Sequence, residues 1–371
     1  MTNTPIWITA ENPLQEIWMM TKSLRSQSVC ERILRNKDPK QTLDDCIISR
    51  KAAGISFLIQ NACDYFEVAS TKNLTQRLLN LYYGTLSFIE AEILANSFEY
   101  SNLDDIENIT KQGHGLYLIN QNTHDVGEIG IGILGKDRGL FPAWLKSRGT
   151  EIEEIPIKKS KTIDQPYVYK LKNLLYIIPE IAQLMQCVDP DYIAGFFRVS
   201  FHIQGNFDSN SLSMEDNTHG SYIALFDDTG TTLPQTVDRI SSKLEDIKPY
   251  SNNLDNIEKA YTAFIKHSKN ENIWYKLNTH KSPFCDNTIL VPLLFDINDW
   301  EVYATIILYC MSILVRYNPS LWRKIQQGDW DGYAAVFDQF AMVIERVIPH
   351  IFYEIITGKK INIKMPGTFG I

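Results

Sequence analysis

The stretch WEVYATIILYCMSILVRYNPSLW, at residues 300–322, decides the fold that we expect. Its fourteen residues from Val302 to Val315 carry no charge, and Arg316 follows them directly. A membrane-spanning helix needs about 20 apolar residues, whereas a run of roughly 10 to 14 is more typical of a buried helix. Pro319 should end the helix, because the residue before a proline avoids helical geometry. The stretch therefore predicts a central core helix rather than a membrane span.

A second apolar segment, LLNLYYGTLSFIEAEILA at residues 78–95, is a candidate partner for this helix. It lies within a predicted helix over residues 74–98. Further helices are predicted over residues 13–34, 43–68 with a break near Gly54, 102–109, 169–187 with an interruption at Pro179, 234–247, 254–267 and 331–357 with a bend at Pro349. The clearest strand is predicted over residues 197–204, where apolar and polar side chains alternate, and residues 221–226 could pair with it. Shorter strands are predicted over residues 116–119 and 131–134.

These elements predict a mainly α fold of the α+β class. We expect a discontinuous helical domain around the two central apolar helices, with a small β-containing insertion. The character of the sequence changes twice along the chain. Residues 1–112 are expected to form an N-terminal helical part, residues 113–235 a glycine-rich and β-containing middle region, and residues 236–371 a C-terminal helical part that packs on the first.

The composition is typical of a folded cytoplasmic protein. Hydrophobic side chains make up 44% of the 371 residues, which is enough to build a large core. The six cysteines are scattered, without a CxxC pair or a histidine at zinc-binding spacing, as is usual for reduced thiols. The first residues lack the basic and apolar regions of a signal peptide. We therefore expect a cytoplasmic location, with no membrane anchor, no metal site and no cofactor.

The charge is acidic overall but unevenly distributed. The net charge of −8 argues against non-specific coating of nucleic acid, whose affinity comes mainly from the neutralisation of phosphates. Basic residues outnumber acidic ones from Lys136 to Lys172. This segment leaves a restricted anion or RNA site possible, although an ordinary solvated surface is the simpler interpretation.

Four short motifs, in this order along nearly the whole chain, resemble those of the bacterial YaaC-like family. They are Leu81-Tyr82-Tyr83-Gly84 followed by Ala91, Gly113-His114-Gly115-Leu116, Gly139-Leu140-Phe141, and Ser312 with Arg316-Tyr317, Pro319 and Trp322. The resemblance implies a bacterial, cytosolic protein and no settled activity. The chain departs from the family at Glu90, where a lysine is expected.

Few residues are candidates for chemistry. Gly130 to Gly135 matches GxGxxG, but we predict a glycine-rich hairpin there because no helix of useful length should begin within it. His114 lies between two glycines, so a ligand could approach it closely, and it is a candidate catalytic residue together with Arg138. A turn residue with a structural hydrogen bond is the simpler interpretation of His114. The sequence does not decide whether the protein is an enzyme.

The candidate binding residues are Arg316, Lys136 and Arg148. If the two central helices pack together, Glu90 or Glu92 could form a buried ion pair with Arg316, and Arg316→Ala would then destabilise the fold. Two functional hypotheses follow. The protein is a non-catalytic interaction or regulatory component that binds a protein partner or forms a homo-oligomer. Alternatively, it is an effector directed at nucleic acid or nucleotides in a bacterial anti-phage defence system.

Overall fold

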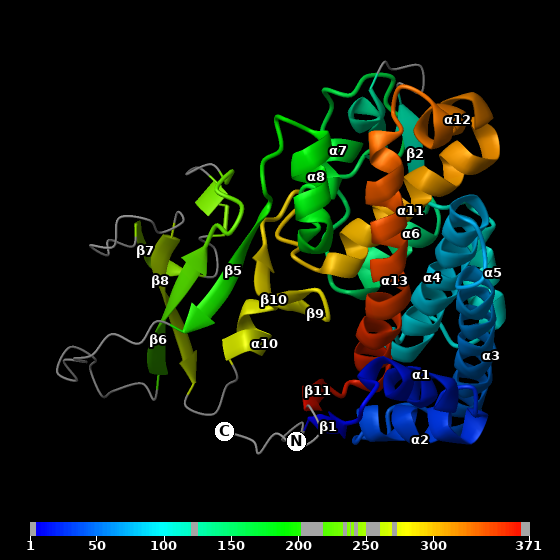
Figure 1. Ribbon diagram of the computed structural model, residues 1–371. Helices are drawn as coiled ribbons and strands as arrows, with labels where there is room; N and C mark the ends of the chain where they lie inside the picture. The colour runs from blue at the N-terminus through cyan, green and yellow to red at the C-terminus, as the bar shows by residue number, and fades with distance from the viewer. Residues whose placement is uncertain are drawn as a thin grey trace. The chain divides into compact units, whose positions relative to one another are not determined.

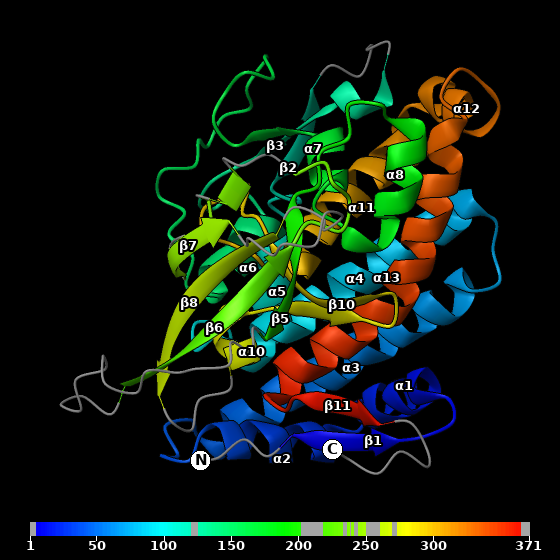
Figure 2. The same cartoon turned by 60° about the vertical axis from the view of Figure 1, so that its left-hand side comes forward.

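The computed structural model describes residues 5–119, 125–201, 218–232, 236–237, 239–240, 244–249, 260–268 and 273–364. Within these residues the protein is mainly helical and contains three sheets, which confirms the predicted class (Figure 1; Figure 2). The chain forms two compact units. Unit 1 consists of Met1–Lys170, Thr305–Asp331 and Phe337–Ile371, and unit 2 consists of Leu171–Ala304 and Gly332–Val336.

The N-terminal helices belong to unit 1. They are α1 (Pro13–Ser23), α2 (Gln27–Lys37), α3 (Asp45–Ala69), α4 (Leu74–Asn96) and α5 (Leu103–Thr110). Helix α1 begins where predicted, because the Asn12 side chain accepts a hydrogen bond from the Gln15 N–H (3.2 Å) and Pro13 occupies the first turn. The prediction of one helix over residues 13–34 is wrong, since the extended backbone of Ser26 separates α1 from α2.

Helices α3 and α4 lie side by side (Figure 1). The predicted break near Gly54 is wrong, because α3 continues through this residue. A Cβ atom at Gly54 would lie 2.8 Å from the Leu94 Cδ1 atom of α4. The glycine is therefore a point of close helix packing rather than a helix break.

The apolar stretch that opens the sequence analysis forms a buried helix. The C-terminal helices are α11 (Trp300–Tyr317), α12 (Pro319–Gln327) and α13 (Gly332–Thr357). Every residue of α11 from Trp300 to Ser312 is buried, and the helix ends just before Pro319, which starts α12. Helix α13 continues through Pro349. Among the helices that the structure describes, none has the length and apolar character needed to span a bilayer.

Unit 1 also holds two small sheets and two short helical elements. Strands β2 (Leu116–Ile119), β3 (Gly130–Ile133) and β4 (Val168–Lys170) are antiparallel, β1 (Ile6–Thr9) pairs in parallel with β11 (Ile361–Lys364), and η1 (Val126–Glu128) and α6 (Leu140–Ser147) flank β3. The two short predicted strands are thus confirmed. Gly132 lies inside β3, where a Cβ atom would come within 2.1 Å of the Tyr117 ring. The first glycines of the GxGxxG match therefore serve strand packing. No helix begins within Gly130–Gly135, and the next helix, α6, begins at Leu140.

Unit 2 is built around a six-stranded antiparallel sheet with the order β7-β8-β6-β5-β10-β9. The strands are β5 (Phe196–Phe201), β6 (Thr218–Phe226), β7 (Glu245–Pro249), β8 (Ala260–Ser268), β9 (His280–Ser282) and β10 (Cys285–Leu290). The short helices are α7 (Leu171–Leu175), η2 (Pro179–Ile181), α8 (Ala182–Val188) and α10 (Ile273–Leu277). Phe197 and Val199 alternate into the core with Ile223 and Leu225 of β6, so the predicted pairing of these two strands is confirmed.

Two predicted helices are wrong over most of their described parts, although residues 236 and 237 are helical. Residues 260–267 form most of β8, and residues 245–247 lie in β7. The long pairing of β8 with β6 supplies backbone hydrogen bonds that local helix preference does not outweigh. The rest of the ranges 234–247 and 254–267 falls largely outside the described residues, as do residues 202–204 of the predicted strand. The predicted helix over 169–187 is divided into α7, η2 and α8.

Candidate binding site around Arg316

Residues from three of the sequence motifs come together in unit 1, and Gly139 of the remaining motif forms a β-bridge with His114. Helix α4 supplies Tyr82 and Tyr83, the turn before β2 supplies His114, and α11 supplies Arg316. We call the following seven residues the tyrosine–arginine cluster: Tyr65, Tyr82, Tyr83, His114, Tyr309, Arg316 and Tyr317. Their side chains form a connected set, with Tyr82 in contact with both His114 and Tyr309, and Tyr65 stacked on Tyr83. Tyr317 joins this set through its contact with Arg316. The predicted contact between the two central apolar helices is therefore present.

The guanidinium group of Arg316 is held in one orientation. Its Nη1 atom donates a hydrogen bond to the Tyr83 hydroxyl (2.7 Å), while Nε donates to the Ser312 carbonyl (3.1 Å) and Nη2 to the Ser312 hydroxyl (3.2 Å). The guanidinium carbon lies 5.8 Å, 5.5 Å and 5.1 Å from the ring centres of Tyr82, Tyr83 and Tyr317. Aromatic faces stabilise such a cation at this distance. The side chain is half-buried, and these contacts fix its orientation.

Arg316 keeps unused hydrogen-bonding capacity. A guanidinium group has five N–H donors, and the three bonds above leave one on Nη1 and one on Nη2. In the described part of the chain, no carboxylate forms an ion pair with Arg316. The expected pair with Glu92 is wrong, because Glu92 binds Arg148, and Glu90 does not replace it. A fixed cation with free donors beside aromatic rings is suited to a carboxylate or phosphate group.

His114 is positioned by two glycines. Gly139 forms an isolated β-bridge with His114, and the N–H groups of Leu140 and Phe141 donate to the carbonyls of Gly113 and His114 (both 3.1 Å). Gly139 has a φ of 117°, and a Cβ atom there would lie 2.0 Å from the Gly113 carbonyl oxygen. Only glycine fits such a position. These contacts explain in physical terms why the motifs around residues 113 and 139 occur together.

The surroundings of His114 favour a neutral ring. Burial lowers the pKa of His114, and the nearby positive charge of Arg316 lowers it further. Its Nδ1 atom lies 3.1 Å from the Tyr82 hydroxyl, whose own pKa is raised by burial. The adjoining cavity, which His114 and Thr305 help to line, measures about 10 Å³ and has room for roughly one water molecule. This setting supports a positioned histidine, and the cavity is too small to enclose a substrate.

The other predicted site residues lie in different surroundings. Lys136 and Arg138 are exposed in the loop between β3 and α6. Arg148 is held by Glu92 in a two-point ion pair, with Nε–Oε1 and Nη2–Oε2 distances of 2.7 Å and 2.8 Å, and it lies over the Trp144 ring. Of the candidate binding residues, Arg316 is thus the one that the fold surrounds with aromatic and polar side chains of the first and last motifs.

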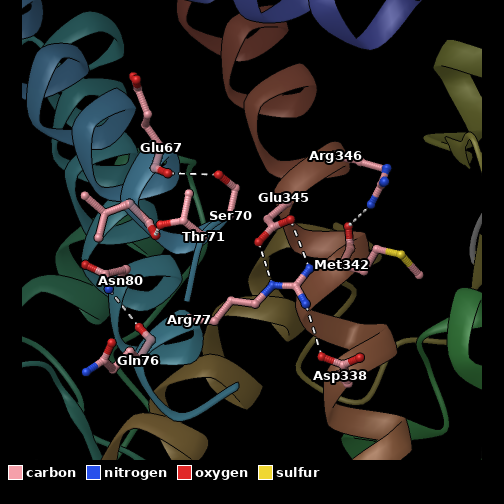
Figure 3. Close-up of polar contacts among 11 residues, drawn as sticks. Glu67, Ser70, Thr71, Gln76, Arg77, Asn80, Asp338, Met342, Glu345 and Arg346 are labelled. Atoms are coloured by element: carbon pink, nitrogen blue, oxygen red, sulfur yellow. Dashed lines mark hydrogen bonds and ion pairs between the residues drawn. The ribbon is translucent and has the colours of Figure 1, made fainter. Parts of the chain in front are cut away.

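Unit 1 also contains a larger groove that the sequence does not reveal. It measures about 410 Å³, and residues of α1, α3 and α13 line it, among them Trp18, Phe66 and Glu345. Glu345 is fixed by Arg77 of α4, whose Nε and Nη2 atoms donate to its carboxylate at 2.6 Å and 2.9 Å (Figure 3). Arg77 also binds Asp338 (3.1 Å). One wall of the groove therefore depends on ion pairs between α4 and α13.

The comparisons with known proteins agree with the motif assignment. A family model described as YaaC-like Protein matches residues 22–356, a range that includes all four motifs and every residue of the tyrosine–arginine cluster. No curated protein and no solved structure matches the chain.

Proposed function

Because this chain belongs to the YaaC-like protein family, we propose that it is a non-catalytic binding protein of the bacterial cytoplasm whose tyrosine–arginine cluster contacts a protein partner. One observation carries the proposal. The guanidinium of Arg316 is oriented by Tyr83 and Ser312, yet in the described part of the chain it has no carboxylate partner. An acidic side chain or a phosphate group of the partner would complete its hydrogen bonding.

The side chains around Arg316 support an interaction surface. Tyr317 is 67% exposed and Tyr65 is 38% exposed, so two aromatic rings at the edges of the cluster face solvent. Tyrosine and arginine are enriched among the residues that dominate the affinity of protein interfaces, because they combine apolar area with hydrogen bonds. The buried members, Tyr82 and Tyr309, contact each other, and Tyr82 also contacts Tyr83, on which Tyr65 stacks. All six cysteines are free thiols, in keeping with a reducing compartment.

The geometry gives less support to catalysis at this site. A general base needs a substrate proton within hydrogen-bonding reach, and a nucleophile needs such a base next to it. The Nδ1 atom of His114 faces Tyr82, whose hydroxyl remains protonated at neutral pH. A neutral histidine with Arg316 nearby can position an anion. The hydroxyl of Ser312, which contacts Arg316, donates its proton to the Tyr309 carbonyl rather than to a base.

A nucleic-acid or nucleotide ligand is the second candidate. Bases stack on aromatic rings, and Arg316 offers a cation for phosphate, so the cluster has both elements of such a site. The basic segment from Lys136 to Lys172 contributes less than its composition suggests. Three of its side chains already bind carboxylates, in the pairs Lys146–Glu99, Arg148–Glu92 and Lys170–Glu128. We therefore place a protein partner first.

The test uses the full chain with Arg316→Met, which keeps much of the side-chain length and removes the charge. Arg32→Met, at an exposed arginine of α2, is the matched control. Tagged proteins are purified from the native bacterium, and a protein that co-purifies with the wild type and the control is identified. Its dissociation constant is then measured with purified components. We expect Arg316→Met to weaken binding by about tenfold or more, which corresponds to one lost charge-assisted contact.

Equal affinity of the wild type and Arg316→Met for that partner would refute the proposed site. A second measurement separates the two candidate functions. Wild type and Arg316→Met are titrated with single-stranded RNA and DNA at low salt, where phosphate contacts are strongest. Binding that depends on Arg316 and weakens steeply with added salt would identify nucleic acid, rather than a protein, as the ligand of the cluster. The protein proposal expects no such binding.

A further inference from the structure

Three potential metal ligands lie close together in unit 2. Glu180 is in η2, His280 begins β9, and Cys285 begins β10. Strands β9 and β10 form an antiparallel hairpin in which Cys285 pairs with Ser282, so that side chains two residues apart on β9 project to the same face as Cys285. A carboxylate oxygen of Glu180, a ring nitrogen of His280 and the Cys285 sulfur all lie within 4.8 Å of one another.

The three potential ligand atoms converge on one point. The Glu180 Oε1 atom lies 2.6 Å from His280 Nε2, and the Cys285 Sγ atom lies 3.7 Å from the same oxygen. The Glu180 and His280 side chains are 0% and 4% exposed, whereas Cys285 is half-buried. The polar atoms are therefore shielded from bulk water, and the thiol side remains accessible to an incoming ion.

Trp300 fixes two of the three candidate ligands. Its Nε1 atom donates a hydrogen bond to the second carboxylate oxygen of Glu180 (3.1 Å). The His280 ring stacks on the Trp300 ring, with centroids 5.1 Å apart and planes only 6° from parallel. Neighbours of this kind hold metal ligands in the required orientation and strengthen metal binding. The hydroxyl of Ser282 lies 3.4 Å from the Cys285 sulfur and supports the third ligand.

We propose that Glu180, His280 and Cys285 bind a divalent transition-metal ion, with Zn²⁺ as the best fit. Zinc prefers thiolate, imidazole and carboxylate ligands, and a thiolate with a carboxylate supplies two negative charges for a doubly charged ion. Hard oxygen-seeking ions such as Mg²⁺ or Ca²⁺ are a poorer match for a sulfur ligand. The sequence predicts no metal site because Glu180 lies one hundred positions before His280, and because His280 and Cys285, five positions apart, follow no zinc spacing.

The distances require a small adjustment. With metal–ligand bonds of about 2.0–2.3 Å, the ligand atoms of a tetrahedral zinc site lie roughly 3.3–3.7 Å apart. The sulfur–oxygen distance of 3.7 Å already fits, while the 2.6 Å between His280 and Glu180 must widen. Metal binding releases the proton that His280 and Glu180 share and the thiol proton of Cys285, so the ion replaces two protons. Three protein ligands leave a fourth position for water.

The experiment measures zinc in the full-length protein after equilibration with Zn²⁺ under reducing conditions and removal of loosely bound metal. The variants are Cys285→Ser, which removes the sulfur ligand, and Cys187→Ser, an exposed cysteine of α8 in the same unit, as the matched control. We expect about one zinc ion per chain in the wild type and control and none in Cys285→Ser. After loading with Co²⁺, a thiolate-to-cobalt absorption band should appear in the wild type and vanish in Cys285→Ser.

A third variant tests the contribution of Trp300, which contacts Glu180 and His280, without removing a ligand. Trp300→Phe keeps an aromatic ring at the position but loses the hydrogen bond to Glu180, and it should weaken zinc binding by roughly 10- to 100-fold. The proposal is overturned if the wild type retains no stoichiometric zinc, or if Cys285→Ser keeps both the zinc and the cobalt band. Loss of metal in the Cys187→Ser control would show that the ion binds at another site, and it would also overturn the proposal. None of these results depends on the Arg316 cluster.

Discussion

Arg148→Ala should destabilise the fold strongly, although the sequence makes Arg148 a candidate binding residue. Its partner Glu92 lies near the C-terminal end of α4 with a side chain only 2% exposed, and Arg148 itself is 15% exposed. Removal of the arginine leaves a buried carboxylate without its counter-ion. Breaking a buried pair from one side costs about 3–5 kcal/mol. Because part of Arg148 reaches solvent, we expect a loss near the lower end, about 3 kcal/mol.

Urea unfolding followed by tryptophan fluorescence measures this loss as a lower midpoint with an unchanged slope. Lys146→Ala is the matched control, because Lys146 also pairs with a glutamate of unit 1 but its side chain and that of Glu99 are 42% and 56% exposed. That variant should lose less than about 1 kcal/mol. The double variant Arg148→Met/Glu92→Leu should regain most of the stability, since it leaves no buried charge. A loss for Arg148→Ala as small as that of Lys146→Ala would refute the reasoning and restore Arg148 as a binding residue.

Three further predictions concern the helices and turns of unit 1. Arg316→Met should cost only about 1 kcal/mol in a thermal or urea melt, because it removes hydrogen bonds and ring contacts but no buried ion pair. Burial raises the pKa of Glu90 to about 7, so its folded pKa exceeds its unfolded pKa and stability is lost as the pH rises from about 4.5 to 7. Glu90→Gln should therefore stabilise the protein at pH 8 and not at pH 5; equal melting shifts at both values would contradict this. Gly139→Ala should lower the unfolding free energy by about 2 kcal/mol or more, because its φ is 117° and the Gly113 carbonyl blocks the new methyl group; an unchanged urea midpoint would show that the turn can relax.

Local signals in the sequence predicted the central helix correctly. The uncharged run before Arg316 and the stop at Pro319 are sufficient to define α11, because both effects act within a few residues. Strand β8 was predicted wrongly for the opposite reason. Its nine residues are stabilised by pairing with β6, which lies about forty positions earlier in the chain, and local spacing carries no information about that partner.

The same distinction applies to charged side chains. Lys51 falls in a helical segment and has the charge of a surface residue, yet it is 2% exposed and donates to the Leu94 carbonyl (2.9 Å) near the C-terminal end of α4. Burial lowers its pKa to about 8. A cation at the end of a helix satisfies free carbonyl groups, but the sequence cannot indicate which helix end a distant lysine will reach. The sequence likewise does not indicate the contact between Glu180 and His280, which lie one hundred positions apart.

The family motifs divide into two physical roles, and this division provides a way to separate structure from binding. Gly113 and Gly139 bring two backbone segments into contact and so position His114. Tyr317 is exposed, and the half-buried Arg316 forms no ion pair in the described part of the chain, so both should contribute less to stability. Substitution at Gly139 should reduce stability and partner binding together, because it moves the histidine and the neighbouring turn. Substitution at Arg316 should reduce binding and leave most of the stability intact. If both substitutions affected only stability, the shared motifs would be explained by folding alone, and the interaction surface would have to be sought elsewhere on the molecule.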